Sequence, residues 1–221
     1  MSNLTLLSNH EKLEGSRMKH IVGLDIETTG SQLDSSRTLQ VAIALGSKVY
    51  CRDVGNYHPK FLWPHDDGGP DWTRSYWRVD PDALKVNHWT KERYEAAQDH
   101  SEVDLILSDR LQHDEGFSPK SLIAVGWNVA GFDMPFVRRD LPRIASFFHY
   151  RTIDLNACVF MLTGGGRPYD ELKARLKELA ATALGRSDWH DAGFDAAAAL
   201  TVFKILRKNY GLRDDSNIPT Q

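Results

Sequence analysis

The chain has 221 residues, of which 41% are hydrophobic and 26% charged, so its composition excludes a disordered protein and favours one compact globular domain. A formal net charge of -3 argues against a protein that binds nucleic acid mainly by coating phosphates with positive charge. No run of eighteen apolar residues occurs, and LTLL near the start is too short for a signal-peptide core. We therefore expect a cytoplasmic protein that neither spans a membrane nor is exported.

The cysteines and the chain ends suggest a single domain without disulfide bonds. Cys51 and Cys158 lie in apolar, strand-like sequence and form no CxxC pair, which indicates neither a zinc ribbon nor a disulfide framework. Residues 1–17 are polar and aperiodic, and Met18 stands directly before the first apolar run. We expect residues 1–17 to be a disordered leader, 18–211 the domain, and 212–221 a tail.

The first part of the predicted domain is a set of strands. Residues 20–26, HIVGLDI, read as a strand, and residues 40–54 predict a hairpin because Gly46 and Ser47 suit a two-residue turn. Residues 56–82 are rich in Pro, Gly, Asp and Trp, which indicates a long loop insertion that forms a lid or a wall beside a site.

Strand and helix alternate in the second part of the domain. Apolar periodicity and turn residues predict, in chain order, a helix at 101–112, a strand at 121–127 and helices beginning at 133, 169 and 192, with Gly164–Gly166 as the break before the helix at 169. The predicted fold class is α/β, with a mixed β-sheet flanked by α-helices.

Two acids end the first strand. Because alternate side chains of a strand share a face, Asp25 and Glu27 point the same way, with Cα atoms roughly 6.5 to 7 Å apart. Like charges held together repel unless one is protonated or a cation lies between them, and hard divalent ions such as Mg²⁺ take carboxylate ligands. The pair therefore indicates a metal site, or else a strand end that has already reached solvent.

Two further acids precede or open helices. Asp133 stands where a helix begins, with Pro135 in the first turn, so it could be an N-cap as well as a ligand. Asp195 heads an apolar helical stripe, which aims its carboxylate at the core side, where a charge is costly unless it is paired or binds a cation. His190, five residues earlier, belongs on the preceding loop.

These clusters together resemble the three motifs of the DEDD superfamily of 3′-5′ exonucleases, in the histidine-bearing branch of DnaQ-like proteins, RNase T and oligoribonuclease. DIETTG carries the first motif with Asp25 and Glu27, NVAGFD the second with Asn128, Phe132 and Asp133, and HDAGFD the third with His190, Ala192 and Asp195. The resemblance extends from about residue 19 to 209. It implies a ribonuclease H-like fold.

The resemblance also implies a reaction. Phosphodiester hydrolysis can be carried out with two divalent cations, Mg²⁺ or Mn²⁺. By resemblance, Asp25 bridges both ions, Glu27 and Asp195 help to hold the ion that carries the attacking water, and Asp133 supports the other ion. His190 is then the general base, because histidine side chains titrate close to neutral pH.

Other residues are candidates for contact with substrate. Thr28, Thr29 and Gly30 follow the first strand and offer hydroxyl or backbone contacts to a terminal nucleotide, although a turn alone would explain them. VNHWT places His88 and Trp89 where relatives carry a short histidine-containing turn near that nucleotide, and Asn128 and Phe132 come with the second motif. Asp191, an acid where relatives often have a basic or neutral residue, could raise the histidine pKa or cap the last helix, and we favour the cap.

We thus expect a metal-dependent exonuclease that acts on single-stranded 3′ ends and releases nucleoside 5′-monophosphates. GWNVAGFDMPFV is more similar to DNA proofreading exonucleases, and FFHYRTIDLNA to oligoribonucleases, so DNA is only slightly favoured over RNA. Relatives suggest a homodimer or a polymerase partner. The alternatives are an oligoribonuclease or RNase T-like exoribonuclease, a non-catalytic nucleic-acid-binding or polymerase-associated module, and an unrelated protein in which the motifs coincide by chance.

Overall fold

A computed structural model describes residues 19–55, 61–62 and 77–210. The expected leader, the expected tail and most of the 56–82 insertion lie outside the described residues, so these three expectations stay predictions.

Six strands form one mixed sheet in the order β6-β3-β2-β1-β7-β8. β1, β2 and β3 are antiparallel neighbours, β7 and β8 continue the sheet parallel to β1, and β6 pairs parallel with β3. The predicted hairpin is confirmed, with Gly46 in the left-handed region that its tight turn requires. The strands are β1 (His20–Thr28), β2 (Thr38–Leu45), β3 (Lys48–Gly55), β6 (Gln98–Asp99), β7 (Leu122–Gly126) and β8 (Phe148–Asp154), with a separate parallel pair of β4 (Phe61–Leu62) and β5 (Trp77–Arg78).

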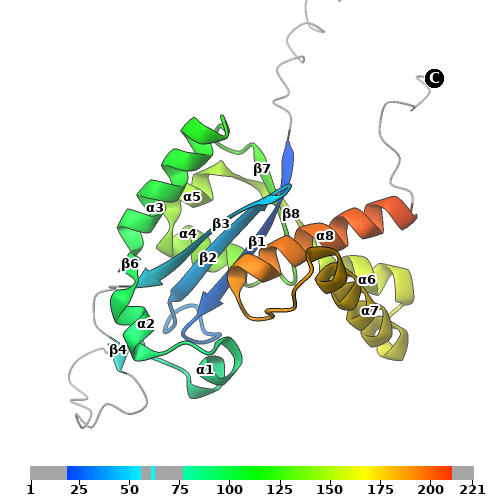
Figure 1. Ribbon diagram of the computed structural model, residues 1–221, viewed down its shortest axis with the longest axis horizontal. Coiled ribbons are helices and arrows are strands. Elements are labelled where there is room, and N and C mark those ends of the chain that lie inside the picture. Colours follow the sequence, from blue (N-terminus) through cyan, green and yellow to red (C-terminus); the bar gives the residue numbers. More distant parts are fainter. Residues whose placement is uncertain (1–18, 56–60, 63–76, 211–221) are drawn as a thin grey trace, which may run out of the picture.

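Helices cover both faces of this sheet (Figure 1). α8 packs across one face, with α6 and α7 against it, while α3, α4 and α5 pack on the other. The helices are α1 (Pro81–Asn87), α2 (Lys91–Ala96), α3 (His100–Asp109), the π-helical turn η1 (Arg110–Asp114), α4 (Asp133–Asp140), α5 (Pro142–Phe147), α6 (Leu155–Thr163), α7 (Gly166–Leu184) and α8 (Ala192–Tyr210). The predicted fold class, a mixed sheet flanked by helices, is confirmed.

The alternation of side chains along β1 decides where its acids point. Val22, Leu24 and Ile26 are buried in the core beneath α3, α4 and α5. The intervening residues, including Asp25 and Glu27, therefore face the side covered by α8. Each face has its own apolar core, and the two acids lie at the end of the strand on the α8 side.

Four details differ from the predictions. α7 begins at Gly166, inside the glycine segment predicted to be a break before a helix at 169. The helix predicted from 133 is two helices, α4 and α5, because Pro142 has no N–H to donate and instead occupies the first turn of α5. Cys158 lies in α6 and not in strand-like sequence. α1 begins at Pro81, within the segment predicted to be irregular.

The cysteines and the helix lengths complete the description. Cys51 and Cys158 are both free. Among the described residues, every helix is too short or too polar to cross a bilayer.

Candidate active site

A glycine on β1 lets the third motif approach the first. A Cβ at Gly23 would overlap the carbonyl oxygen of Ala196, so only glycine allows α8 to pack this closely on β1. Ala196 directly follows Asp195 on α8. The close packing brings the Asp195 carboxylate beside the acids two and four residues further along β1.

Asp133 joins the same site from α4. Its side chain is 3% exposed, and its Oδ1 accepts a hydrogen bond from the backbone N–H of Ile26 at 3.1 Å. Ile26 is the residue between Asp25 and Glu27. The alternative that Asp133 is an N-cap is wrong, because Phe132 occupies that position and no side chain caps the helix. The carboxylate instead reaches across to β1.

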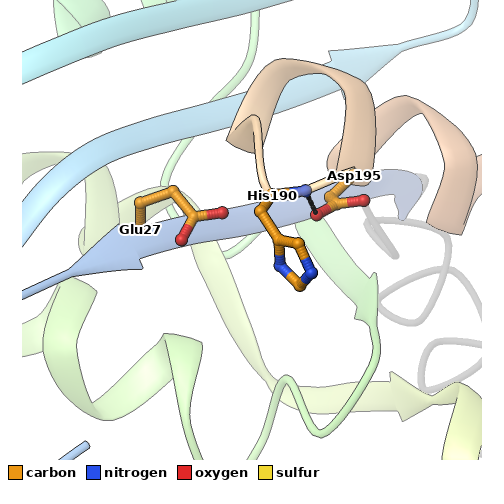
Figure 2. A group of neighbouring side chains, drawn as sticks. All are labelled: Glu27, His190 and Asp195. Atoms are coloured by element: carbon orange, nitrogen blue, oxygen red, sulfur yellow. Dashed lines mark hydrogen bonds between the residues drawn. The ribbon is translucent and has the colours of Figure 1, made fainter. Parts of the chain in front are cut away.

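His190 lies on the loop before α8, as predicted, and bonds to Asp195 through its backbone. Its N–H donates to Asp195 Oδ2 at 2.9 Å (Figure 2). The other oxygen, Asp195 Oδ1, is buried and accepts no hydrogen bond within the described part of the chain. A buried carboxylate oxygen without a donor is costly unless a cation or another group completes it.

Three donor groups gather closely here. One possible ligand atom each from Glu27, His190 and Asp195 lies within 4.8 Å of the other two. In Figure 2 the Glu27 carboxylate, from β1, points toward His190 and Asp195. His190 lies on the loop before α8, and Asp195 lies in the first turn of α8. Carboxylate oxygens and an imidazole nitrogen suit a divalent cation.

The acids and the histidine open into one cavity of about 420 Å³. Eight of the residues that the sequence singled out line this cavity: Asp25, Glu27, Thr28, Gly30, Phe132, Asp133, His190 and Asp195.

The other candidates have structural contacts outside the cavity lining. Thr29 is fully buried, and its Oγ1 accepts from the Arg37 N–H at 2.9 Å. Asn128 adopts a left-handed conformation, and its carbonyl accepts from the N–H of Phe132 at 2.9 Å, closing the turn before α4.

The two candidates from VNHWT follow α1. His88 is exposed and caps the C-terminus of α1 in a left-handed conformation. Trp89 is only 3% exposed and packs in the core, with the guanidinium carbon of Arg93 4.1 Å from its ring centroid. The structure therefore gives the Trp89 ring a core contact rather than a free face.

One wall of the cavity is formed by α1, a helix that the sequence analysis missed. Asn87, buried at its end, donates to the Thr28 carbonyl at 3.0 Å and accepts from the Trp89 N–H at 3.1 Å, which ties α1 to the end of β1. The start of this helix is visible in the sequence: Asp80 is an N-cap, bonded to the Asp82 N–H, and Pro81 follows in the first turn. The sequence Asp80-Pro81-Asp82 is thus a helix-start signal that predicts α1.

Burial raises the pKa values of all four carboxyl groups in the metal-free protein, and nearby carboxylates add to the shift. Burial is the largest cause in each case. Burial raises the pKa of Glu27 to about 8, and repulsion from Asp195 and Asp133 contributes to this shift. Burial also raises the pKa of Asp133 to about 8. The pKa of Asp25 is raised well above its usual value, and that of Asp195 is raised as well. Acids that repel in this way, together with the orphan oxygen of Asp195, fit a divalent cation as the missing partner.

These raised pKa values predict how the stability of the metal-free protein depends on pH. Glu27 and Asp133 have folded-state pKa values above those of an unfolded chain, so folding binds protons, and stability is lost as pH rises through about 8. In EDTA, the melting temperature should therefore be higher at pH 6 than at pH 9. Saturating Mn²⁺ should flatten the trend, because the cation then replaces the protons. An EDTA melting temperature that is equal or higher at pH 9 would contradict the raised pKa values.

The sequence matches no protein-family model and no curated protein. Solved structures do resemble the chain. E. coli exonuclease I in complex with a dT13 oligonucleotide aligns with a TM-score of 0.56 and 17% identity, over 86% of this chain and 41% of that one. The chain has the fold of the matched part of exonuclease I.

Two more structures give the same result. The zinc-bound form of the E. coli exonuclease I–ssDNA complex aligns with a TM-score of 0.55 and 20% identity, over 86% of this chain and 41% of that one. Exonuclease I from Methylocaldum szegediense aligns with a TM-score of 0.56 and 19% identity, over 86% of this chain and 40% of that one. The chain thus spans about two fifths of the length of these proteins. Exonuclease I is a DnaQ-like 3′-5′ exonuclease of the histidine-bearing branch, so the predicted likeness is confirmed at the level of the fold.

Proposed function

We propose that the chain is a metal-dependent 3′-5′ exonuclease that hydrolyses phosphodiester bonds at single-stranded 3′ ends. The observation that carries the proposal is the convergence of Asp25, Glu27, Asp133 and Asp195, with His190 at their edge, in one cavity. The likeness to exonuclease I, solved with single-stranded oligonucleotides, supports the same reaction class.

The four carboxylates are the groups that would hold two divalent cations, Mg²⁺ or Mn²⁺. When bound, such ions neutralise charge on the phosphate and lower the pKa of water. The protein contributes the placement of the carboxylates: the Ile26 N–H orients Asp133, and the His190 N–H orients Asp195 and leaves Oδ1 for a ligand.

His190 is the group placed to move the proton. Its imidazole is exposed, next to Glu27 and Asp195, and takes a proton from the attacking water. The water oxygen bonds to phosphorus, the bond from phosphorus to the 3′ oxygen breaks, and that oxygen takes up a proton. The products are a nucleoside 5′-monophosphate and a chain shorter by one nucleotide.

Single-stranded DNA is the favoured substrate. The second motif is more similar to DNA proofreading enzymes, and the neighbouring structures contain ssDNA oligonucleotides. An exoribonuclease of the oligoribonuclease or RNase T kind is the alternative, because FFHYRTIDLNA resembles those enzymes.

A gel time course tests the proposal. DNA and RNA single strands of equal sequence, labelled at the 5′ end, are incubated with the protein in Mg²⁺, Mn²⁺ or EDTA. A metal-dependent ladder that shortens from the 3′ end is expected, and the polymer that is consumed identifies the substrate. If neither polymer is cleaved but both are bound in EDTA, the chain is instead a binding module.

A further inference from the structure

A row of polar side chains crosses the sheet beside the candidate active site. Gln40 on β2 is in register with Glu27 on β1 and with Asp53 on β3. Cross-strand partners in register project from the same face, so these three side chains lie in line on the α8 side. Gln40, in the middle of the row, is only 3% exposed. A buried amide must be hydrogen-bonded to be tolerated, so its partners matter.

Both ends of the Gln40 amide are engaged, and two of its three partners follow His190 directly. Its Nε2 donates to Asp53 Oδ1 at 3.0 Å and to Asp191 Oδ2 at 3.3 Å, and its Oε1 accepts from the Ala192 N–H at 2.8 Å. Asp191 is in turn the cap of α8, because its Oδ1 accepts from the Phe194 N–H at 3.0 Å. The capping role expected for Asp191 is confirmed, and Gln40 is what holds that cap against the sheet.

The loop held in this way carries a residue in a demanding conformation. His190 has φ of 69°, in the left-handed region that residues other than glycine seldom adopt. Such a conformation persists only when the surroundings enforce it. On one side the His190 N–H is bonded to Asp195, and on the other Gln40 holds the next two residues.

The same network reaches the α1 wall of the cavity. Asp53 accepts two hydrogen bonds from the Arg93 guanidinium, both at 2.8 Å. That guanidinium stacks on the Trp89 ring, and the backbone N–H of Trp89 donates to Asn87 Oδ1. Gln40 is therefore linked, through Asp53 and Arg93, to the α1 wall on one side and directly to the loop that carries His190 on the other.

We propose that Gln40 is a positioning residue for the hydrolysis. Acting through Asp191 and Ala192, it fixes the loop so that the His190 imidazole stays next to Glu27 and Asp195. This inference rests on the proposed function and adds to it a residue outside the three motifs.

An isosteric substitution tests it. Gln40→Glu keeps the shape and the acceptor for the Ala192 N–H, but it removes both donations and places a third carboxylate beside Asp53 and Asp191. Loss of such supporting contacts around a metal site typically costs about 10- to 100-fold. We expect kcat to fall by about that factor, while KM and the binding of labelled oligonucleotide in EDTA stay within about twofold.

A second substitution should restore the interaction. In Gln40→Glu/Asp191→Asn, the asparagine amide donates to the new carboxylate, and its oxygen still caps the Phe194 N–H. In Asp191→Asn alone, the new amide N–H group faces the Gln40 Nε2 donor, so the bond is lost and kcat should also fall. We expect the double variant to recover kcat to within about threefold of wild type, a rescue that a general loss of stability would not show.

Two further variants separate positioning from folding. Gln40→Met removes every bond without adding charge, so its kcat should fall and should not recover with Asp191→Asn. Asp104→Asn weakens a buried cap of α5, whose bonds come from the Arg143 and Ile144 N–H groups, and should lower the melting temperature without changing kcat.

The outcomes that overturn the inference are specific. A wild-type kcat in folded Gln40→Glu or Gln40→Met would refute it, as would a loss in Gln40→Glu that Asp191→Asn does not repair. A wild-type protein that hydrolyses neither polymer would instead refute the proposed function, and this inference with it.

Discussion

Asp25→Asn should abolish nearly all hydrolysis and, in the absence of metal, make the protein more stable. Changing a contact that only supports a metal ligand costs about 10- to 100-fold, so loss of a ligand at the centre of the site should cost more than about a hundredfold. The measurement is the rate of nucleotide release from labelled single strands in Mg²⁺ and Mn²⁺.

The gain in stability has a separate physical cause. Burial and the charges of Asp133, Asp195 and Glu27 raise the Asp25 pKa well above its usual value, so an ionised Asp25 destabilises the metal-free fold at neutral pH. An uncharged amide of the same size removes that cost. The melting temperature of Asp25→Asn in EDTA at pH 7.5 should therefore exceed that of wild type, whereas Mn²⁺ should raise it less than it raises wild type.

A matched control is available on α7. Asp170 is exposed, so Asp170→Asn makes the same chemical change without touching the cavity and should leave rate and melting temperature near wild type. The site assignment would be wrong if Asp25→Asn kept its activity. The electrostatic argument would be wrong if Asp25→Asn melted lower than wild type in EDTA.

The two acids of β1 could be predicted because strand alternation is a local rule. Val22, Leu24 and Ile26 define the buried face, and Asp25 and Glu27 must then lie on the other. The role of Asp133 could not be obtained in this way. In the sequence, an Asp that caps a helix cannot be told from one that binds a metal. Only the packing of α4 against β1 shows that the Asp133 carboxylate bonds to the Ile26 N–H.

Contacts between distant segments account for the rest of what the sequence analysis missed. Gln40 reads as an ordinary polar residue in an apolar strand, yet its partners lie 13 and more than 150 residues away. Asn87 likewise has its function through the Thr28 carbonyl, 59 residues away. Neither periodicity nor a motif reports such pairings, because tertiary packing creates them.

His190→Asn should lower kcat by about 10²- to 10⁴-fold, the usual contribution of a general base, with little change in metal binding. Asparagine tolerates the left-handed backbone better than alanine does, and the bond from the backbone N–H at this position to Asp195 is kept. The variant therefore removes the imidazole while leaving the loop in place. The measurement is kcat for His190→Asn and wild type side by side, at saturating substrate and Mg²⁺.

The same variant distinguishes the base from a metal ligand, because a His190 nitrogen lies within 4.8 Å of carboxylate oxygens of Glu27 and Asp195. If the imidazole takes up protons, Mn²⁺ should raise the melting temperature of His190→Asn and of wild type at similar concentrations. If the imidazole instead binds the cation, His190→Asn should need at least about tenfold more Mn²⁺, and the base assignment would fail. His113 is an exposed residue of η1 outside the cavity lining, so His113→Asn removes an imidazole there and should change neither kcat nor the Mn²⁺ requirement.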